Sequence, residues 1–321
     1  MLTPREVLPG AYQITLPLPF ELSSVNVYLI PLETGFLLVD CGLGTAESLA
    51  SLETQLAQLG VSWSQIREIF LTHTHPDHVG QAPRLLALTG AKISMHSDEK
   101  EQLARIARGP ANQPAWLDEA LRRAGVPRAL VEGIEAAFAR IKPNFPDLEP
   151  DRVWRGGEIL ETSLGELELI PTPGHSPGHL CLYSKQHRTL FCGDHMLKEI
   201  TPNIGWLDGR DALGEFLASL ERVAELEVDT LLPGHGEPFH GSQAWIAATK
   251  THHQNRCEVI LGALEAGPLT AHELVGAVWP QPLAPFHHRF AVFEVLAHLE
   301  HLRKCGRVVE LPQPSHSLWS L

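Results

Sequence analysis

The sequence predicts an α/β protein in which two β-sheets are sandwiched between helices, giving four layers. Two stretches lead to this prediction, residues 25–95 and 165–232, because strand-like and helix-like segments alternate in both. Of the 321 residues, 44% are hydrophobic and 20% are charged, and no long apolar run occurs. This composition excludes collagen-like, disordered and membrane-spanning proteins.

The first stretch begins with two short runs of β-branched and aromatic residues, 25–30 and 35–40, which predict a hairpin of buried strands. Residues 46–59 follow with leucines at helical spacing, and Gly60 ends the predicted helix as a C-cap. The pattern then predicts three further elements: a strand at 66–71, a helix at 80–88 and a strand at 92–95.

Residues 97–150 interrupt this alternation with charged, helix-patterned stretches, and they are expected to form an inserted helical layer. Strand-like segments resume after it. The second stretch predicts strands at 165–170, 180–184 and 189–192, a helix at 211–226 and a strand at 230–232.

After residue 240 the chain is mostly helix-patterned, with expected helices at 243–266, 271–278 and 287–304 and a short strand at 307–311. Three helices followed by a strand are typical of a small winged-helix module. The sequence therefore predicts a catalytic domain at 1–240, with 97–150 inserted in it, and a C-terminal module at 241–321.

The formal net charge is -13, and most of the acidic excess lies in residues 151–240, which hold 15 acids and 7 bases. The C-terminal module is balanced, with 6 of each. Because no segment has the basic excess that phosphate-backbone binding needs, we expect a small-molecule substrate and no nucleic-acid partner. A homodimer is an open alternative.

The N-terminal residues lack a basic segment followed by an apolar run, so we expect a cytoplasmic protein without a membrane segment. The five cysteines are far apart and form no CxxC pair, and we interpret them as buried, reduced thiols: Cys41, Cys181, Cys192, Cys257 and Cys305.

The chemistry is concentrated in residues 73–78, His-Thr-His-Pro-Asp-His, at the end of a predicted strand. Imidazole is the commonest metal ligand among side chains, and carboxylates hold and bridge divalent ions. On an extended chain His73 and His75 share one face, so both rings can bind one ion. Asp77 and His78 lie past the turn and can bind a second.

Three later strands also end at a ligand-type residue that follows a glycine: His175, Asp194 and His235. Strand ends are where side chains of neighbouring strands converge. With these motifs the chain resembles the metallo-β-lactamase fold superfamily over residues 20–240, and its ligand pattern is similar to that of hydroxyacylglutathione hydrolases.

The resemblance implies the four-layer αββα sandwich and a dinuclear metal site. His73, His75 and His175 would hold the first metal, Asp77, His78 and His235 the second, and Asp194 would bridge them. Asp40 would be a partner that steadies the histidine cluster. Zinc is the expected metal, with iron and manganese as alternatives.

Two metals imply hydrolysis by a bridging hydroxide, since a water on zinc ionises with a pKa of about 7. Asp77 is the candidate catalytic residue that steers the hydroxide or carries its proton. Asp194 argues against a true β-lactamase, because that group generally lacks the bridging aspartate.

The fold alone does not settle the substrate. The leading hypothesis is a small ester or thioester, with acyl-CoA or glutathione thioesters favoured. Three alternatives are a lactonase, a phosphodiesterase like single-strand endoribonucleases, and a non-catalytic regulator that keeps its metals. Residues 241–311 resemble the lactamase-associated winged-helix module, in which nuclease relatives occur.

Apolar residues in the insertion would suit a lid over the metal cleft and an acyl chain beneath it, although they would equally serve to pack the insertion: Trp116, Leu117, Leu121, Phe138 and Ile141. The adjacent pairs 252–253 and 287–288 point about 100° apart on a helix, so no second histidine site is expected. Seven other histidines are interpreted as surface or core residues: His96, His187, His240, His272, His298, His301 and His316. His179 and His195 come shortly after ligands, and we interpret them as packing or hydrogen-bonding neighbours, with a role in supporting a ligand or contacting substrate as the alternative.

Overall fold

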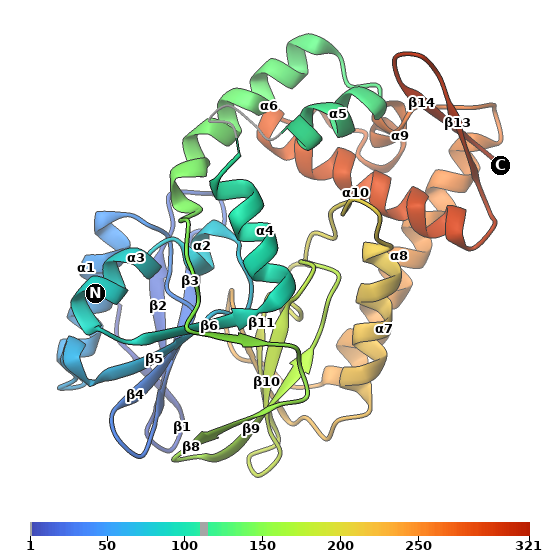
Figure 1. Ribbon diagram of the computed structural model, residues 1–321. Helices are drawn as coiled ribbons and strands as arrows, with labels where there is room; N and C mark the ends of the chain where they lie inside the picture. The colour runs from blue at the N-terminus through green and yellow to red at the C-terminus, as the bar shows by residue number, and fades with distance from the viewer. Residues whose placement is uncertain (1, 110–114) are drawn as a thin grey trace. The chain divides into compact units, whose positions relative to one another are not determined.

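The computed structural model describes residues 2–109 and 115–321, and side chains from 117 onward in the second range (Figure 1). The chain divides into two compact units. The first comprises Met1–Arg108, Pro143–Pro202 and Ala224–Ser242, and the second comprises Gly109–Lys142, Asn203–Val223 and Gln243–Leu321.

The first unit holds a seven-stranded sheet whose strands follow one another in chain order, antiparallel from β1 to β4 and parallel from β4 to β7. Its strands are β1 (Arg5–Leu8), β2 (Ala11–Pro17), β3 (Ser24–Pro31), β4 (Phe36–Val39), β5 (Ile66–Phe70), β6 (Lys92–His96) and β7 (Arg152–Trp154). The parallel strands are joined by helical segments: α1 (Ala46–Gln58), η1 (Trp63–Gln65), α2 (Pro76–Val79), α3 (Ala82–Thr89) and α4 (Ser97–Ala107).

A second sheet of five strands has the order β12-β11-β10-β9-β8, and its one parallel pair is β11 with β12. Its strands are β8 (Ile159–Thr162), β9 (Gly165–Pro171), β10 (Leu180–Ser184), β11 (Thr189–Gly193) and β12 (Thr230–Pro233).

Two hydrophobic cores explain why the strands read as continuous apolar runs. In β4, Leu37 and Val39 join a core that also contains Leu169 and Leu182 of the second sheet. The intervening Leu38 belongs to the other core, together with leucines of α1, α3 and α4. A strand that is buried on both faces shows no polar alternation. The predicted α/β class with two sheets is confirmed.

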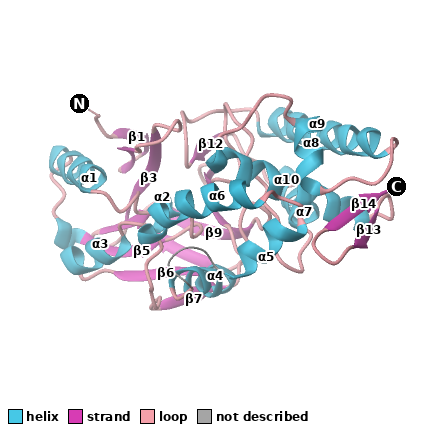
Figure 2. Ribbon diagram, turned by 90° about the horizontal axis from the view of Figure 1, so that it is seen from above, coloured by secondary structure: helices cyan, strands magenta, loops and turns pink. Residues whose placement is uncertain are grey.

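The second unit is mostly helical. It contains α5 (Ala115–Arg123), α6 (Arg128–Ile141), most of α7 (Ala212–Ala224), α8 (Ser242–Leu264), α9 (Ala271–Val278), α10 (Pro285–Lys304) and a hairpin of β13 (Val309–Pro312) with β14 (Ser317–Ser320) (Figure 2). A short helical turn, η2 (Lys142–Asn144), follows α6. The N-cap of α9 is a capping box in which Thr270 and Glu273 satisfy each other's backbone N–H groups.

The segment expected as one insertion, 97–150, is divided between the units, since α4 falls in the first and α5 and α6 in the second. Its role as a lid stays a prediction. Leu117, Leu121 and Phe138 are buried, whereas the side chain of Trp116 lies outside the described residues. No helix in the described part of the chain is long and apolar enough to cross a membrane.

Candidate metal centre

The site begins where β4 and β5 end. Asp40 directly follows β4 and adopts a left-handed backbone conformation, with φ of 63°. Its Oδ1 accepts the N–H of Thr72 at 2.8 Å, and its Oδ2 accepts Nδ1–H of His78 at 2.8 Å. Asp40 therefore fixes the loop after β5 and leaves Nε2 of His78 directed at Asp194, whose Oδ1 lies 3.4 Å away.

A relay through Thr72 orients His73 in the same way. The Thr72 hydroxyl donates to Asp40 Oδ2 at 2.9 Å, so it accepts from Nδ1–H of His73 at 3.0 Å. This leaves Nε2 of His73 with a free lone pair, 3.0 Å from Nδ1 of His75. Two imidazole nitrogens this close can share one cation.

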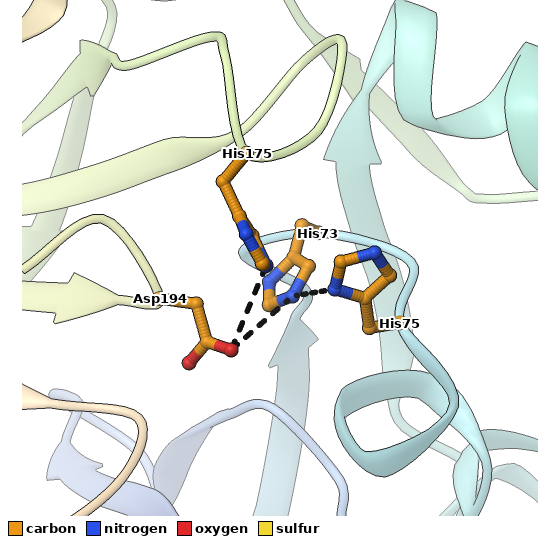
Figure 3. Close-up of side chains that lie close together, drawn as sticks. All are labelled: His73, His75, His175 and Asp194. Atoms are coloured by element: carbon orange, nitrogen blue, oxygen red, sulfur yellow. Dashed lines mark hydrogen bonds and ion pairs between the residues drawn. The ribbon is translucent and has the colours of Figure 1, made fainter. Parts of the chain in front are cut away.

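The other three predicted ligands come from loops after β9, β11 and β12. His175 follows β9, Asp194 follows β11, and His235 follows β12. His235 donates from Nδ1 to the carbonyl oxygen of Ser24 at 2.7 Å, so its Nε2 faces the cluster. Figure 3 shows the rings of His73, His75 and His175 converging beside the carboxylate of Asp194.

The seven side chains form two groups that can each hold a cation: His73, His75, His175 and Asp194 in one, and Asp77, His78 and His235 in the other. Asp194 lies between them. Its Oδ2 is 3.6 Å from Nε2 of His175 and 3.4 Å from Nε2 of His235. The structure thus brings together all seven residues that the sequence singled out.

Gly234 permits this close approach. A Cβ at this position would lie 2.3 Å from Oδ1 of Asp194 and 3.0 Å from Cε1 of His78. Because a real Cβ essentially never comes that close to another heavy atom, any side chain at residue 234 would displace the aspartate.

Sequence reasoning missed Glu99, a fully buried carboxylate in the first turn of α4. Its Oε2 accepts the N–H and the hydroxyl of Thr74, at 2.9 and 2.7 Å. Its Oε1 accepts the hydroxyl of Ser176 at 2.6 Å and the N–H of Gly178 at 2.7 Å. One carboxylate therefore joins the loop of His73 and His75 to the loop of His175.

His179 holds the backbone of Asp194. It donates from Nδ1 to the Thr172 hydroxyl at 2.8 Å, and its Nε2 accepts the N–H of Asp194 at 3.1 Å. Burial, followed by repulsion from His195, lowers the pKa of His179 well below the ordinary value, which keeps Nε2 an acceptor.

The electrostatics of the two groups differ. Burial, followed by repulsion from His175, lowers the pKa of His75 to about 3, so its ring is neutral at pH 7. Burial also opposes charge on His235, but the carboxylates of Asp194 and Asp77 outweigh it and raise the pKa of His235 to about 10. The carboxylates of Asp77 and Asp194 thus favour positive charge beside His235.

The donor set fits divalent cations. Nε2 of His78 and Oδ1 of Asp194 are buried and lie 3.4 Å apart, and neither atom makes a hydrogen bond within the described residues. A buried polar atom without a hydrogen bond costs about 1–3 kcal/mol, which a coordinated cation would offset. Imidazole and carboxylate ligands without thiolates are typical of catalytic metal sites, whereas closed structural sites favour cysteine. The cluster is compatible with a dinuclear site.

A third group, His252, His253 and Glu294, lies in the second unit with ligand atoms within 4.8 Å of one another. From the sequence we expected adjacent histidines on a helix to point too far apart to share an ion. The ligand atoms of His252 and His253 nevertheless lie close enough to do so. However, Glu294 is already bound by the Arg256 guanidinium and by Asn203, whose Nδ2 donates at 2.7 Å. A guanidinium on the only carboxylate of the group disfavours a further cation, so we interpret these residues as a buried polar network.

Comparisons with known proteins agree with this geometry. The model of the metallo-beta-lactamase superfamily matches residues 21–235, and the model of the metallo-beta-lactamase-like C-terminal domain matches residues 257–316. A crystal structure of a metallo-beta-lactamase family protein, TTHA1429 from Thermus thermophilus, is 32% identical, with a TM-score of 0.79 over 98% of this chain and 99% of that one. A beta-lactamase domain protein from Burkholderia ambifaria is 26% identical, with a TM-score of 0.88 over 99% of this chain and 94% of that one.

Among curated relatives, the probable metallo-hydrolase YqjP of Bacillus subtilis is 27% identical over 83% of this chain and 84% of its own length. The acyl-coenzyme A thioesterase MBLAC2 of Gallus gallus is 26% identical, over 70% of this chain and 76% of its own. The atrochrysone carboxyl ACP thioesterase AgnL7 of Paecilomyces divaricatus is 24% identical, over 81% of this chain and 68% of its own length.

Proposed function

This chain belongs to the metallo-beta-lactamase superfamily, and from that premise we propose that it hydrolyses a small thioester or ester, with acyl-CoA and glutathione thioesters as the first candidates. The observation that carries the proposal is the position of Asp194, whose two oxygens face imidazoles of both groups. A carboxylate so placed could bind two cations at once. Two of the curated relatives are named as thioesterases, which supports this substrate class.

In the proposed site His73, His75 and His175 would hold one divalent cation, Asp77, His78 and His235 would hold the other, and Asp194 would bridge them. When bound, such cations lower the pKa of a water and polarise the substrate carbonyl. The donor set does not select one metal, and zinc is our proposal.

The chain's own residues have distinct tasks in this scheme. Asp40, Thr72 and the carbonyl of Ser24 fix which imidazole nitrogen faces the site. Asp77 is the most exposed carboxylate of the cluster, with 17% of its side chain accessible against 9% for Asp194. This exposure supports the proposal that Asp77 orients the attacking water and carries its proton.

The thioester proposal is tested with a substrate panel on the metal-loaded protein: acyl-CoA and glutathione thioesters, lactones and bis(p-nitrophenyl) phosphate. We expect the highest kcat/KM with a thioester. His75→Ala should abolish that turnover, while His240→Ala, which changes an exposed histidine, should leave it intact.

Other outcomes would contradict the proposal in different ways. Activity confined to the phosphodiester would favour a nuclease-like enzyme, and activity confined to lactones would favour a lactonase. Bound metal without turnover of any substrate would indicate a non-catalytic regulator.

A further inference from the structure

Cys305 is the exception among the five cysteines. The expectation that all are buried is wrong for it: Cys41, Cys181, Cys192 and Cys257 are buried, but Cys305 is exposed. Burial raises the pKa of Cys181 to about 12 and that of Cys257 to about 11, which makes these thiols inert at neutral pH. Cys305 is therefore the thiol that a solute can reach.

Cys305 ends α10, and His301 lies one turn before it on the same helix. The Cys305 sulfur is 3.8 Å from Nε2 of His301, within hydrogen-bond range for sulfur. On its other side, Nδ1 of His301 donates to the carboxylate of Asp211, at 3.1 Å from Oδ2 and 3.2 Å from Oδ1. A thiol, an imidazole and a carboxylate thus stand in line within the second unit.

Asp211 is held in place by a second role. It precedes α7, and its Oδ1 accepts the N–H of Gly214 at 2.9 Å, which caps that helix. Partial burial alone would raise the pKa of Asp211, but the hydrogen bonds from His301 and Gly214 outweigh it and hold the pKa below its usual value. The carboxylate is thus both ionised and fixed.

This arrangement determines which nitrogen of the His301 imidazole faces the thiol without a proton. A carboxylate accepts and does not donate, so Nδ1 of His301 carries a proton and Nε2 presents its lone pair to the thiol. A nucleophile next to a base that a third group orients is the general signature of an activated nucleophile. The imidazole is therefore positioned to take the thiol proton, which gives the thiolate that attacks a disulfide.

We propose that Cys305, His301 and Asp211 form a reactive-thiol site that takes a low-molecular-weight disulfide and becomes a mixed disulfide. His301 accepts the thiol proton, and the Cys305 thiolate attacks one sulfur of the disulfide. The Cys305 S–S bond forms, the original S–S bond breaks, and His301 returns the proton to the departing thiolate. One thiol and one disulfide are consumed and one of each is produced, so no other oxidant is needed.

A disulfide suits the site because exchange requires access to one sulfur and no enclosing pocket. A cavity of about 390 Å³ in the same unit is lined by Trp206, Leu296 and Trp319 among others, and none of the three proposed residues contributes to it.

The test treats the metal-loaded full chain with oxidised glutathione and maps the adduct by mass spectrometry. We expect one glutathione per chain, on Cys305, and none on Cys305→Ser. His301→Gln should slow adduct formation at least about tenfold, since a general base typically contributes more than that. Asp211→Asn keeps the cap, because asparagine caps helices as well as aspartate does, and it should slow the reaction less than His301→Gln does.

Three results would overturn the proposal. The first two are an adduct on a buried cysteine and no adduct on Cys305. The third is an equal rate of adduct formation in the wild type, His301→Gln and Asp211→Asn, when both variants keep the wild-type circular dichroism spectrum. The site does not depend on the proposed hydrolysis, so Cys305→Ser should leave the metal-dependent turnover unchanged.

Discussion

Glu99 accepts two hydrogen bonds from Thr74 on one oxygen, from the backbone N–H at 2.9 Å and from the hydroxyl at 2.7 Å. Thr74 stands between His73 and His75 in the chain. Because the other oxygen of Glu99 binds the loop of His175, this carboxylate sets the spacing of the three imidazoles that we assign to one metal.

Glu99→Gln should weaken binding of one metal equivalent by about 10- to 100-fold, the usual loss when a group that orients ligands is changed. A glutamine amide brings N–H groups to face donors at one of the two loops. Chelator competition with two metal equivalents measures the effect. Glu101→Gln, an exposed residue on the same helix, is the matched control, and equal affinities for the two variants would refute the role of Glu99.

Asp40→Asn should weaken both metal groups, because Oδ2 of Asp40 accepts Nδ1–H of His78 and also the Thr72 hydroxyl that orients His73. Asparagine tolerates the left-handed backbone at residue 40 as aspartate does, so the change mainly removes an acceptor from these two contacts. We expect a loss of about 10- to 100-fold in affinity for both equivalents. Asp147→Asn, which alters an exposed ion pair with Arg108, should bind metal like wild type.

Gly234→Ala should disrupt both groups, because the added Cβ would lie 2.3 Å from Oδ1 of Asp194. The variant is expected to bind less than two equivalents and to lose turnover. Gly262→Ala in α8 meets nothing within 4 Å and provides the control. If Gly234→Ala retained both equivalents, Asp194 would not be fixed where we describe it.

The buried pair His253 and His298 should make stability depend on pH. Burial, followed by repulsion from its partner, lowers the pKa of His253 to about 2, and burial lowers that of His298 to about 3. The unfolded chain binds protons at these residues below about pH 6.5 and the folded chain does not. Their contribution is therefore present above pH 6.5 and is lost as the pH falls from there toward 3.

Denaturant unfolding of the metal-free full chain at pH 7.5 and 5.0 measures this dependence. The double variant His253→Leu, His298→Leu should lower the pH-dependent change in unfolding free energy by about 4 kcal/mol, since each histidine contributes about 2 kcal/mol between these pH values. A double variant with the wild-type slope would contradict the neutral state of the pair.

Local patterns predicted the elements that carry the site. Residues 73–78 could be recognised because several ligand-type side chains lie close together there and follow a buried strand. Three more ligands could be recognised because each follows a glycine at the end of a predicted strand. Residues of one strand and the loop that follows it are neighbours in the sequence, so their pattern can be seen there.

Contacts between segments that are far apart in the chain could not be predicted from local patterns. Glu99 looks like any acid in a first helical turn, and only the fold brings it to Ser176, 77 residues later in the chain. Asp211 and His301 are 90 residues apart, so their alignment with Cys305 could not be predicted from spacing. The division of residues 97–150 between two units is likewise a property of tertiary packing.

The most direct test of the central claim is the initial rate of acyl-CoA hydrolysis as zinc is added to the metal-free protein. We predict a rate that rises with added metal and reaches its plateau at two equivalents per chain. A hydrolysis rate that does not depend on added zinc, or no hydrolysis when two equivalents are bound, would contradict a dinuclear thioester hydrolase.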